Sequence, residues 1–248
     1  VEVLSLSSLD CLVLDAEHAP FDRAALDLCI LAARAGGKTV LVRPQSASHE
    51  HILNALDCGA DGVILPHICN AADAEDAVKA CHYISGGRGY AGSSRAAGYT
   101  TKGMAKHRAD ATNVTIVAQI EDVEGVENIE AIAAVDGIDA LFIGRADLTI
   151  SYAAQTPDDT IVVDAVDRIV AAGKKAGRMT GQDIHRNPDF EPTAVLGPEI
   201  VGHLPVSHLA IPNCGDASAK EEFLRFIKVP VEHLGVVGEM EVGTVVRD

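Results

Sequence analysis

One apolar run near the start of the chain ends abruptly in side chains that could do chemistry. The run centred on Val13 is typical of a strand buried on both faces. It is followed at once by two acids and a histidine, Asp15, Glu17 and His18. In parallel α/β proteins, chemistry is placed where the chain leaves the carboxyl end of a strand. These three side chains could therefore do acid–base chemistry, although Asp15 could equally cap the next helix and His18 could be a solvated loop residue.

Four later apolar runs end in a similar way. The residues at or just after their ends are Arg43, then Pro66 and His67, then Gln119 and Glu121, and finally Asp147 in "GRADL". If these runs are parallel strands of a barrel, all their ends meet at one rim. Each residue alone could be a cap or a surface charge. Several carboxylates, a histidine and an arginine at the same topological position instead favour a functional site.

Two of these acids suggest a metal. Glu121 and Asp147 follow consecutive strands, and carboxylate oxygens suit a hard cation such as Mg²⁺ or Mn²⁺. The alternative is that Asp147 caps a helix and Glu121 pairs with a neighbouring cation. Arg43 offers a planar fork for a carboxylate or an enolate oxygen, or else forms a structural ion pair beneath the rim.

The composition limits the classes of protein. The 248 residues include 48% hydrophobic and 4% aromatic residues and no Trp, so the core must be aliphatic. The net charge of −16 repels phosphate backbones and anionic membranes, which argues against a nucleic-acid partner. No apolar run reaches the length of a membrane span. The six cysteines form no CxxC pair, which favours reduced thiols in a cytoplasmic protein over a cysteine zinc site.

A repeated strand-then-helix pattern must position the rim residues. Strands are predicted over residues 11–15, 39–44, 61–66, 114–121 and 138–144. Helices are predicted over 22–36, over 49–59 ("HEHILNALDCG", closed by Gly59), and over 70–84, 123–135 and 159–177. Residues 85–103 are predicted to form a loop that is functional or mobile. Fainter signals predict a strand at 206–212 and a helix at 216–228. This alternation predicts one (β/α)₈-barrel domain over residues 1–248, with a doubly wound sheet as the alternative. That alternative is weakened because no GxGxxG turn joins a predicted strand to the following helix.

Several motifs resemble one enzyme family. The blocks "LDAEHAPFD", "LVRP", "LDCGADGVILPHI", "GGRGYAGSSRAAGY", "VAQIED" and "VDGIDALFIGRADL" occur in order between Val1 and about Ile150. Together they resemble the HpcH/HpaI hydroxyketoacid aldolases, which are class II pyruvate aldolases. The resemblance implies a TIM barrel of the phosphoenolpyruvate/pyruvate type. It also implies reversible cleavage of 4-hydroxy-2-oxoacids to pyruvate and an aldehyde through a metal-bound enolate.

The resemblance also implies roles for individual residues. Glu121 and Asp147 match the metal ligands, with Mg²⁺ or Mn²⁺ expected and Co²⁺ or Zn²⁺ as alternatives. Arg43 matches the arginine that contacts the pyruvate oxygen, and His18 matches the acid/base histidine. Asp57 in "LDCG" matches an acid that pairs with a neighbouring subunit's histidine, as expected in a homo-oligomer, by resemblance a hexamer. The residues expected to organise the metal's waters and the substrate around these groups are Asp15, Glu17, Gln119, Gly144 and Ala146.

The residues themselves are consistent with that chemistry. No lysine is evident at a strand end to form a Schiff base, because Lys38 precedes its strand and Lys102 lies in a loop. A metal acting as a Lewis acid on the carboxylate and keto oxygens is the alternative way to stabilise an enolate. His18, acting through a water, would then remove the proton of the 4-hydroxyl group.

Three features depart from the family pattern. Arg145 stands where the family has Pro. It is expected to point outward, although it could instead weaken metal binding or bind a second substrate carboxylate. The family's first strand is missing before Val1, and extra sequence follows Lys228. We hypothesise that part of the tail at 229–248 takes the vacant strand position; the neutral alternative places it on the surface. Two other functions stay open, a citramalyl- or malyl-CoA-type lyase and an inactive ligand-binding barrel.

Overall fold

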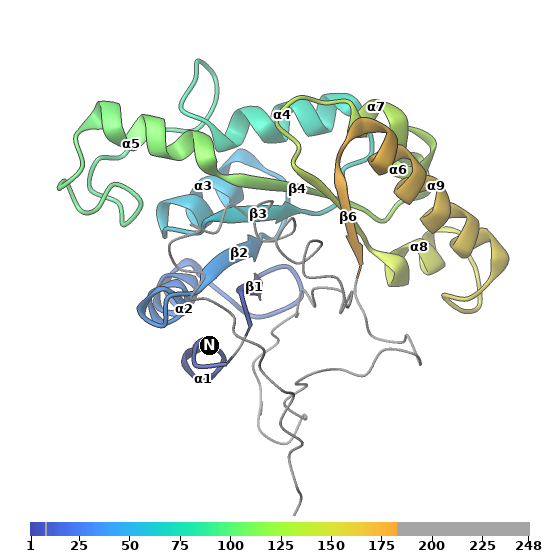
Figure 1. Ribbon diagram of the computed structural model, residues 1–248, viewed down its shortest axis with the longest axis horizontal. Helices are drawn as coiled ribbons and strands as arrows, with labels where there is room; N and C mark the ends of the chain where they lie inside the picture. The colour runs from blue at the N-terminus through green and yellow to red at the C-terminus, as the bar shows by residue number, and fades with distance from the viewer. Residues whose placement is uncertain (8, 183–248) are drawn as a thin grey trace, which may run out of the picture.

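A computed structural model describes residues 1–7 and 9–182 of the chain (Figure 1). The strand expected at 206–212, the helix expected at 216–228 and the tail at 229–248 lie outside the described residues. The hypothesis that the tail closes a barrel therefore stays a prediction. No helix in the described ranges is long and apolar enough to cross a membrane.

Six parallel strands form one sheet in which each strand lies beside the next in sequence. They are β1 (Cys11–Asp15), β2 (Thr39–Arg43), β3 (Gly62–Leu65), β4 (Thr115–Ile120), β5 (Ala140–Ile143) and β6 (Met179–Gln182). The first five confirm the strands predicted from the apolar runs. The sixth was not predicted, because its sequence "MTGQ" carries neither an apolar run nor clear alternation.

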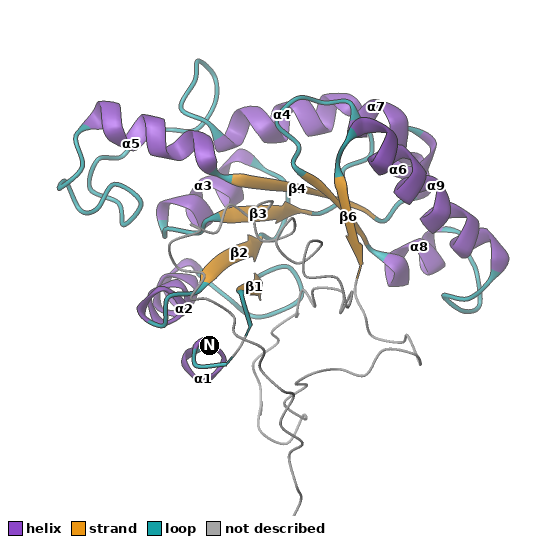
Figure 2. Ribbon diagram, viewed as in Figure 1, coloured by secondary structure: helices purple, strands orange, loops and turns teal. Residues whose placement is uncertain are grey.

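Helices follow the strands and cover one face of the sheet (Figure 2). They are α1 (Glu2–Ser5), α2 (Arg23–Ala35), α3 (His49–Asp57), α4 (Ala71–Cys81), α5 (Met104–Asp110), α6 (Val123–Glu127), α7 (Ile129–Ala133), α8 (Arg145–Ser151) and α9 (Thr160–Ala176), together with a 3₁₀ turn, η1 (Ala111–Asn113). The side chain of Asp22 accepts a hydrogen bond from the backbone N–H of Ala25 at the start of α2, and Asn70 caps α4 in the same way.

The structure differs from the predicted helices at three places. The helix expected over 123–135 is divided at Asn128 into α6 and α7. The short helices α5 and α8 were not predicted, because seven residues are too few to show a helical period. The 85–103 segment contains neither helix nor strand, as predicted.

The two faces of the sheet bury different sets of side chains. Leu12, Leu14, Val40 and Val42 face the helices and belong to the large core that also includes the inner sides of α2, α3, α4 and α9. A smaller core lies on the opposite face, formed by Cys11, Val13, Leu41, Ile64, Val117, Ala140 and Phe142. This division follows from the period of two along a strand. The covered outer face and the apolar inner face are those of a half-barrel.

The described part of the chain is thus a mixed α/β fold whose parallel sheet forms a half-barrel. β1 and β6 are the two edges of this sheet among the described residues. Among the described residues, α1 precedes β1.

Candidate active site

Polar side chains continue the inner face of the sheet at the carboxyl ends of its strands. Asp15 follows Cys11 and Val13 by the period of two, and Arg43 follows Leu41. Gln119 and Glu121 follow Val117 in the same way, and Gly144 follows Ala140 and Phe142. The alternation that buries apolar groups deeper in the half-barrel therefore brings these polar groups to one rim, as predicted.

Asp15 and Arg43 form a buried ion pair across β1 and β2. The two residues are directly opposite in the parallel register. Arg43 donates from Nε to Asp15 Oδ1 at 2.9 Å and from Nη2 to Oδ2 at 2.5 Å, which is a two-bond fork. Asp15 Oδ1 also accepts the backbone N–H groups of Glu17 and His18. Burial acts to raise the pKa of Asp15, but the guanidinium and the backbone donors outweigh it and hold that pKa below its usual range.

Glu17 lies between three basic side chains without a close hydrogen bond to any of them. Its Oε2 is 3.4 Å from Arg43 Nε and 3.8 Å from His18 Nε2, and its Oε1 is 3.6 Å from His67 Nε2. Burial raises the pKa of this carboxyl, and the cations around it only partly offset the rise. Its buried Oε2 has no hydrogen-bond partner within the described ranges.

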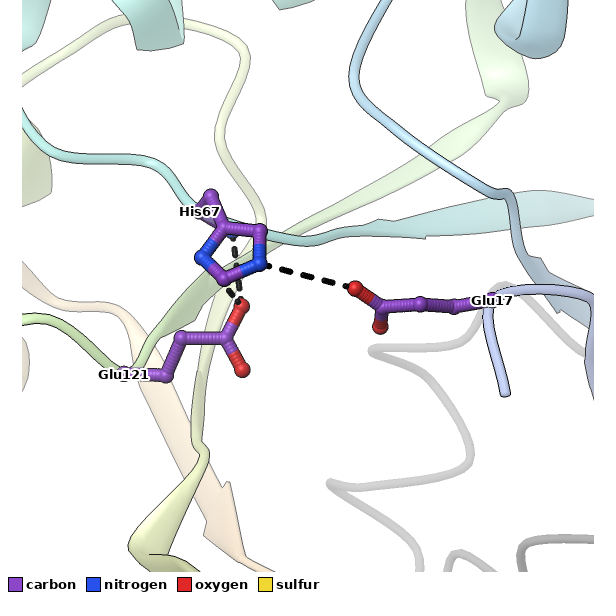
Figure 3. Close-up of side chains that lie close together, drawn as sticks. All are labelled: Glu17, His67 and Glu121. Carbon is purple, nitrogen blue, oxygen red and sulfur yellow. Dashed lines mark hydrogen bonds and ion pairs between the residues drawn. The ribbon is translucent and has the colours of Figure 1, made fainter. Parts of the chain in front are cut away.

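His67 lies between two acids that follow β1 and β4, Glu17 and Glu121, as Figure 3 shows. Its backbone N–H donates to Glu121 Oε1 at 2.8 Å, and its Nδ1 lies 2.9 Å from Asp122 Oδ2 and 3.4 Å from Glu121 Oε1. The backbone at His67 has φ of 55°, in the left-handed region that non-glycine residues seldom adopt. The hydrogen bond to Asp122 is the main cause that raises the pKa of His67.

Glu121 is held on its other side by Gln119 and Gly144. Gln119, which is fully buried, donates from Nε2 to Glu121 Oε2, while its own Oε1 has no partner in the part of the chain that the structure describes. A Cβ at Gly144 would come within 2.7 Å of Glu121 Cβ and 2.9 Å of its Oε2, so only glycine leaves room for this carboxylate. Burial raises the pKa of Glu121.

Of the other residues predicted for the site, Asp147, Ala146 and His18 follow the carboxyl ends of strands, whereas Asp57 does not. Asp147 is half-buried in the first turn of α8, which starts directly after Gly144, and Ala146 beside it is exposed. His18 is exposed at the rim, with its side chain 63% accessible. Asp57 lies at the end of α3, which runs back from the carboxyl end of β2 toward the amino end of β3. It is buried in an ion pair with Arg88 and is not part of the rim of its own chain.

Arg145 turns away from Glu121. Its guanidinium donates to the carbonyl of Pro157 at 2.6 and 2.9 Å and lies 3.1 Å from Asp158. The arginine therefore anchors the loop between α8 and α9. This agrees with the expectation that it points outward.

The sequence pattern missed the part that His67 plays in this group. His67 was noted at the end of its strand, but no role was assigned to it, and Asp122 was not singled out. A signal was present in the spacing, because "PHI" after β3 and "QIED" after β4 end neighbouring strands. What the pattern could not show is the left-handed backbone that turns the imidazole toward Glu121.

The donor set fits a divalent cation. One ligand atom from each of Glu17, His67 and Glu121 lies within 4.8 Å of the others. Glu121 is buried and the side chain of Glu17 is only 10% exposed, and burial raises the pKa of both carboxyl groups. A cation at such a site would supply the partner that the buried Oε2 of Glu17 lacks among the described residues. Oxygen-rich donors of this kind bind Mg²⁺, Mn²⁺ and related ions.

Comparison with known proteins finds a matching family model and several named relatives. The family model described as HpcH/HpaI aldolase/citrate lyase matches residues 1–191. The hydroxypyruvate/pyruvate aldolase of Roseobacter denitrificans is 35% identical over 190 residues, which is 73% of either chain. The 4-hydroxy-2-oxovalerate aldolase of Rhodococcus jostii is 36% identical over 185 residues, which is 72% of this chain and 71% of that protein.

A solved structure gives the same result. The crystal structure of an HpcH/HpaI aldolase/citrate lyase family protein from Burkholderia cenocepacia superposes with a TM-score of 0.70 and 32% identity, covering 73% of both chains. The family model covers more than half of this chain, and the relatives match it over most of their own length. The chain therefore belongs to the HpcH/HpaI aldolase/citrate lyase family.

Proposed function

We propose that this protein is a metal-dependent pyruvate aldolase that reversibly cleaves 4-hydroxy-2-oxoacids to pyruvate and an aldehyde. The observation that carries the proposal is the inner rim of the half-barrel. There the Arg43 fork, held by Asp15, lies 3.4 Å from the carboxylate of Glu17. Glu17 in turn shares one group of possible ligands with the buried Glu121. Relatives at 35–36% identity are named as aldolases of hydroxypyruvate, pyruvate and 4-hydroxy-2-oxovalerate, which supports the same substrate class here.

The rim residues have different roles in such a reaction. Cleavage of the C3–C4 bond of a 4-hydroxy-2-oxoacid leaves an enolate with negative charge on the C2 keto oxygen, and a divalent cation held by Glu121 and Asp147 would supply Lewis-acid stabilisation of that charge. Arg43, whose orientation Asp15 holds, binds the oxoacid oxygens and adds positive charge where the enolate develops.

His18 is the proposed acid/base. It is exposed at the rim beside Glu17, where a substrate hydroxyl or a water could reach it. It would take the proton of the 4-hydroxyl in cleavage and return it in condensation, and a positioned base of this kind contributes about 10²–10⁴-fold. Gln119 and Gly144 hold the Glu121 carboxylate in place and leave room for it.

The proposal extends to the complete fold and the assembly. A closed (β/α)₈ barrel in a single domain needs two strands beyond the six that the structure describes. The consecutive order of those six, with helices on the outer face, supports such closure. We also propose a homo-oligomer, a hexamer by family resemblance, in which Asp57 serves a neighbouring subunit. Light scattering tests the assembly, and an active monomer would contradict it.

A pyruvate-release assay on 4-hydroxy-2-oxovalerate tests the function. We expect the purified protein to release pyruvate, to lose activity with a chelator and to regain it on addition of Mg²⁺ or Mn²⁺. Glu121→Gln preserves the size of the side chain and should lose activity at ordinary metal concentrations, whereas Glu130→Gln, an exposed glutamate paired with Arg168, should not. Full activity in metal-free buffer, or none under any condition, would contradict the proposal.

A further inference from the structure

We propose that His67 is a nitrogen ligand, through Nε2, of the divalent ion that is proposed above to be held by Glu121 and Asp147. Glu17, whose carboxylate lies beside the imidazole, is a further ligand of the same ion. The inference rests on the proposed metal-dependent function and deepens it, because it predicts which ions the site prefers. A nitrogen donor favours first-row transition ions such as Co²⁺ and Zn²⁺ over Mg²⁺, which prefers oxygen.

The hydrogen bonds of His67 leave Nε2 available. Nδ1 lies 2.9 Å from Asp122 Oδ2, and because a carboxylate only accepts, Nδ1 carries the proton of that bond. In the neutral ring, Nε2 is then the atom with the free lone pair. Histidines that bind metals almost always donate their other ring N–H to a carboxylate or carbonyl in this way.

The ring is directed by its backbone as well as by Asp122. The peptide N–H of His67 donates to Glu121 Oε1 at 2.8 Å, and φ at this residue is 55°. Asp122 directly follows Glu121 in the chain, so one short segment after β4 both supplies an acid of the site and orients the imidazole. Figure 3 shows the ring between the carboxylates of Glu17 and Glu121.

The separations of the donor atoms fit a shared ion. His67 Nε2 and Glu17 Oε1 are 3.6 Å apart, too far for a good hydrogen bond. Two ligands each about 2.1 Å from one ion, at angles of roughly 90–110°, lie roughly 3.0–3.5 Å from each other. The observed distance is close to that range, and one atom from each of the three residues lies within 4.8 Å of the others.

Glu17 provides an independent indication of a missing ligand. Its side chain is only 10% exposed, and its buried Oε2 has no hydrogen-bond partner among residues 1–7 and 9–182. A buried carboxylate oxygen without a partner is costly. This Oε2 lies 3.4 Å from Arg43 Nε, whereas the other oxygen, Oε1, points toward His67 (Figure 3) and lies 3.6 Å from its Nε2. An ion held by Oε1 and by His67 would neutralise the same carboxylate.

Metal binding measured without substrate tests the inference. Metal-free full-length protein is titrated calorimetrically with Co²⁺ and with Mg²⁺, for the wild type, His67→Asn and the control His49→Asn. His49 is a partly exposed histidine paired with Asp76 at 3.0 Å, away from the rim. We expect His67→Asn to raise the Co²⁺ Kd at least about tenfold, a loss that even removal of a supporting hydrogen bond can cause. The Mg²⁺ Kd should change much less, and His49→Asn should change neither.

Pulsed EPR of the Mn²⁺-loaded wild type gives a readout that needs no folded variant. A coordinated imidazole nitrogen should couple to the ion in the wild type and in His49→Asn, and the coupling should be absent in His67→Asn. Absence of nitrogen coupling in the wild type, or equal weakening of Co²⁺ and Mg²⁺ in His67→Asn, would overturn the inference while leaving a metal-dependent aldolase intact. If no divalent ion binds the wild type, the proposed function fails with it.

Discussion

Two buried Arg–Asp pairs of this molecule have the same chemistry in different surroundings. Arg43 and Asp15 lie at the ends of adjacent strands, on the inner face of the half-barrel. Arg88 and Asp57 instead join the segment after α4 to the end of α3. The Arg88 guanidinium lies 4.7 Å from the centre of the Tyr83 ring, in a group that includes the rings of Tyr90 and His107.

The two pairs differ in which polar groups in or beside them have no hydrogen-bond partner. Beside the first pair lies a third charged side chain, Glu17, whose Oε2 is 3.4 Å from Arg43 Nε. This oxygen is buried and has no hydrogen-bond partner among the described residues. Around Arg88 the neighbours are aromatic, and the unpartnered group is basic: the buried Nε of Arg88 has no hydrogen-bond partner among the described residues. The Asp57 carbonyl also holds the loop by accepting the N–H of Ala96. We infer that the first pair serves ligand binding, because an excess of poorly solvated acid is useful only where a cation or substrate is to be bound. The second pair serves the stability of its own chain, in addition to the role proposed for Asp57 toward a neighbouring subunit.

The largest expected effect is a loss of unfolding free energy when the Arg88–Asp57 pair is broken. Arg88→Ala leaves Asp57 buried without its cation, and the loss should be about 3–5 kcal/mol of unfolding free energy in urea. As a control, Arg168→Ala breaks an exposed pair with Glu130 and should cost at most ~1 kcal/mol. Wild-type stability of Arg88→Ala would show that the Arg88–Asp57 pair is not structural.

The next effect separates the pairs by activity. Arg43→Lys keeps the charge but loses the planar fork, so kcat/KM for the oxoacid should fall about 10²–10³-fold, with a higher KM and a lower kcat. Arg95→Lys makes the same substitution in a pair with Asp27 away from the rim and should leave both constants near wild type. Wild-type kinetics for Arg43→Lys would remove Arg43 from the site.

The smallest effect is the pH dependence of the Arg43–Asp15 pair. Since the pKa of Asp15 is lower in the folded protein than in the unfolded chain, the unfolded chain takes up the proton first on acidification. The contribution of the ionised Asp15 to stability is therefore complete above the ordinary carboxyl pKa and is lost as the pH falls through the lowered pKa of the folded protein. Urea unfolding between neutral and acidic pH should show a shallower loss for Asp15→Asn than for the wild type.

An exposed acid gives the control for that measurement. The pKa of Asp110 is lowered by Lys106 and Lys102, which are at the surface. High salt should reduce the contribution of Asp110 and leave most of that of the buried Asp15, because buried pairs are screened less. Equal salt sensitivity of Asp15→Asn and Asp110→Asn would contradict a buried pair at the rim.

Much of the fold could be predicted from local pattern. The five apolar runs and the glycine that ends α9 are signals within a few residues of each other. The missed elements, α5, α8 and β6, are four to seven residues long, too short to show a period. The division of one predicted helix into α6 and α7 was missed as well.

The sequence by itself determined which residues reach the rim. The period of two along each strand places Asp15, Arg43 and Glu121 on the inner face, whatever the details of packing. Only the tertiary structure decided which of them meet. The pairing of Asp57 with Arg88 and the approach of His67 to Glu17 join strands and loops far apart in the chain. They depend on the parallel register and on one left-handed residue, and no local pattern carries either.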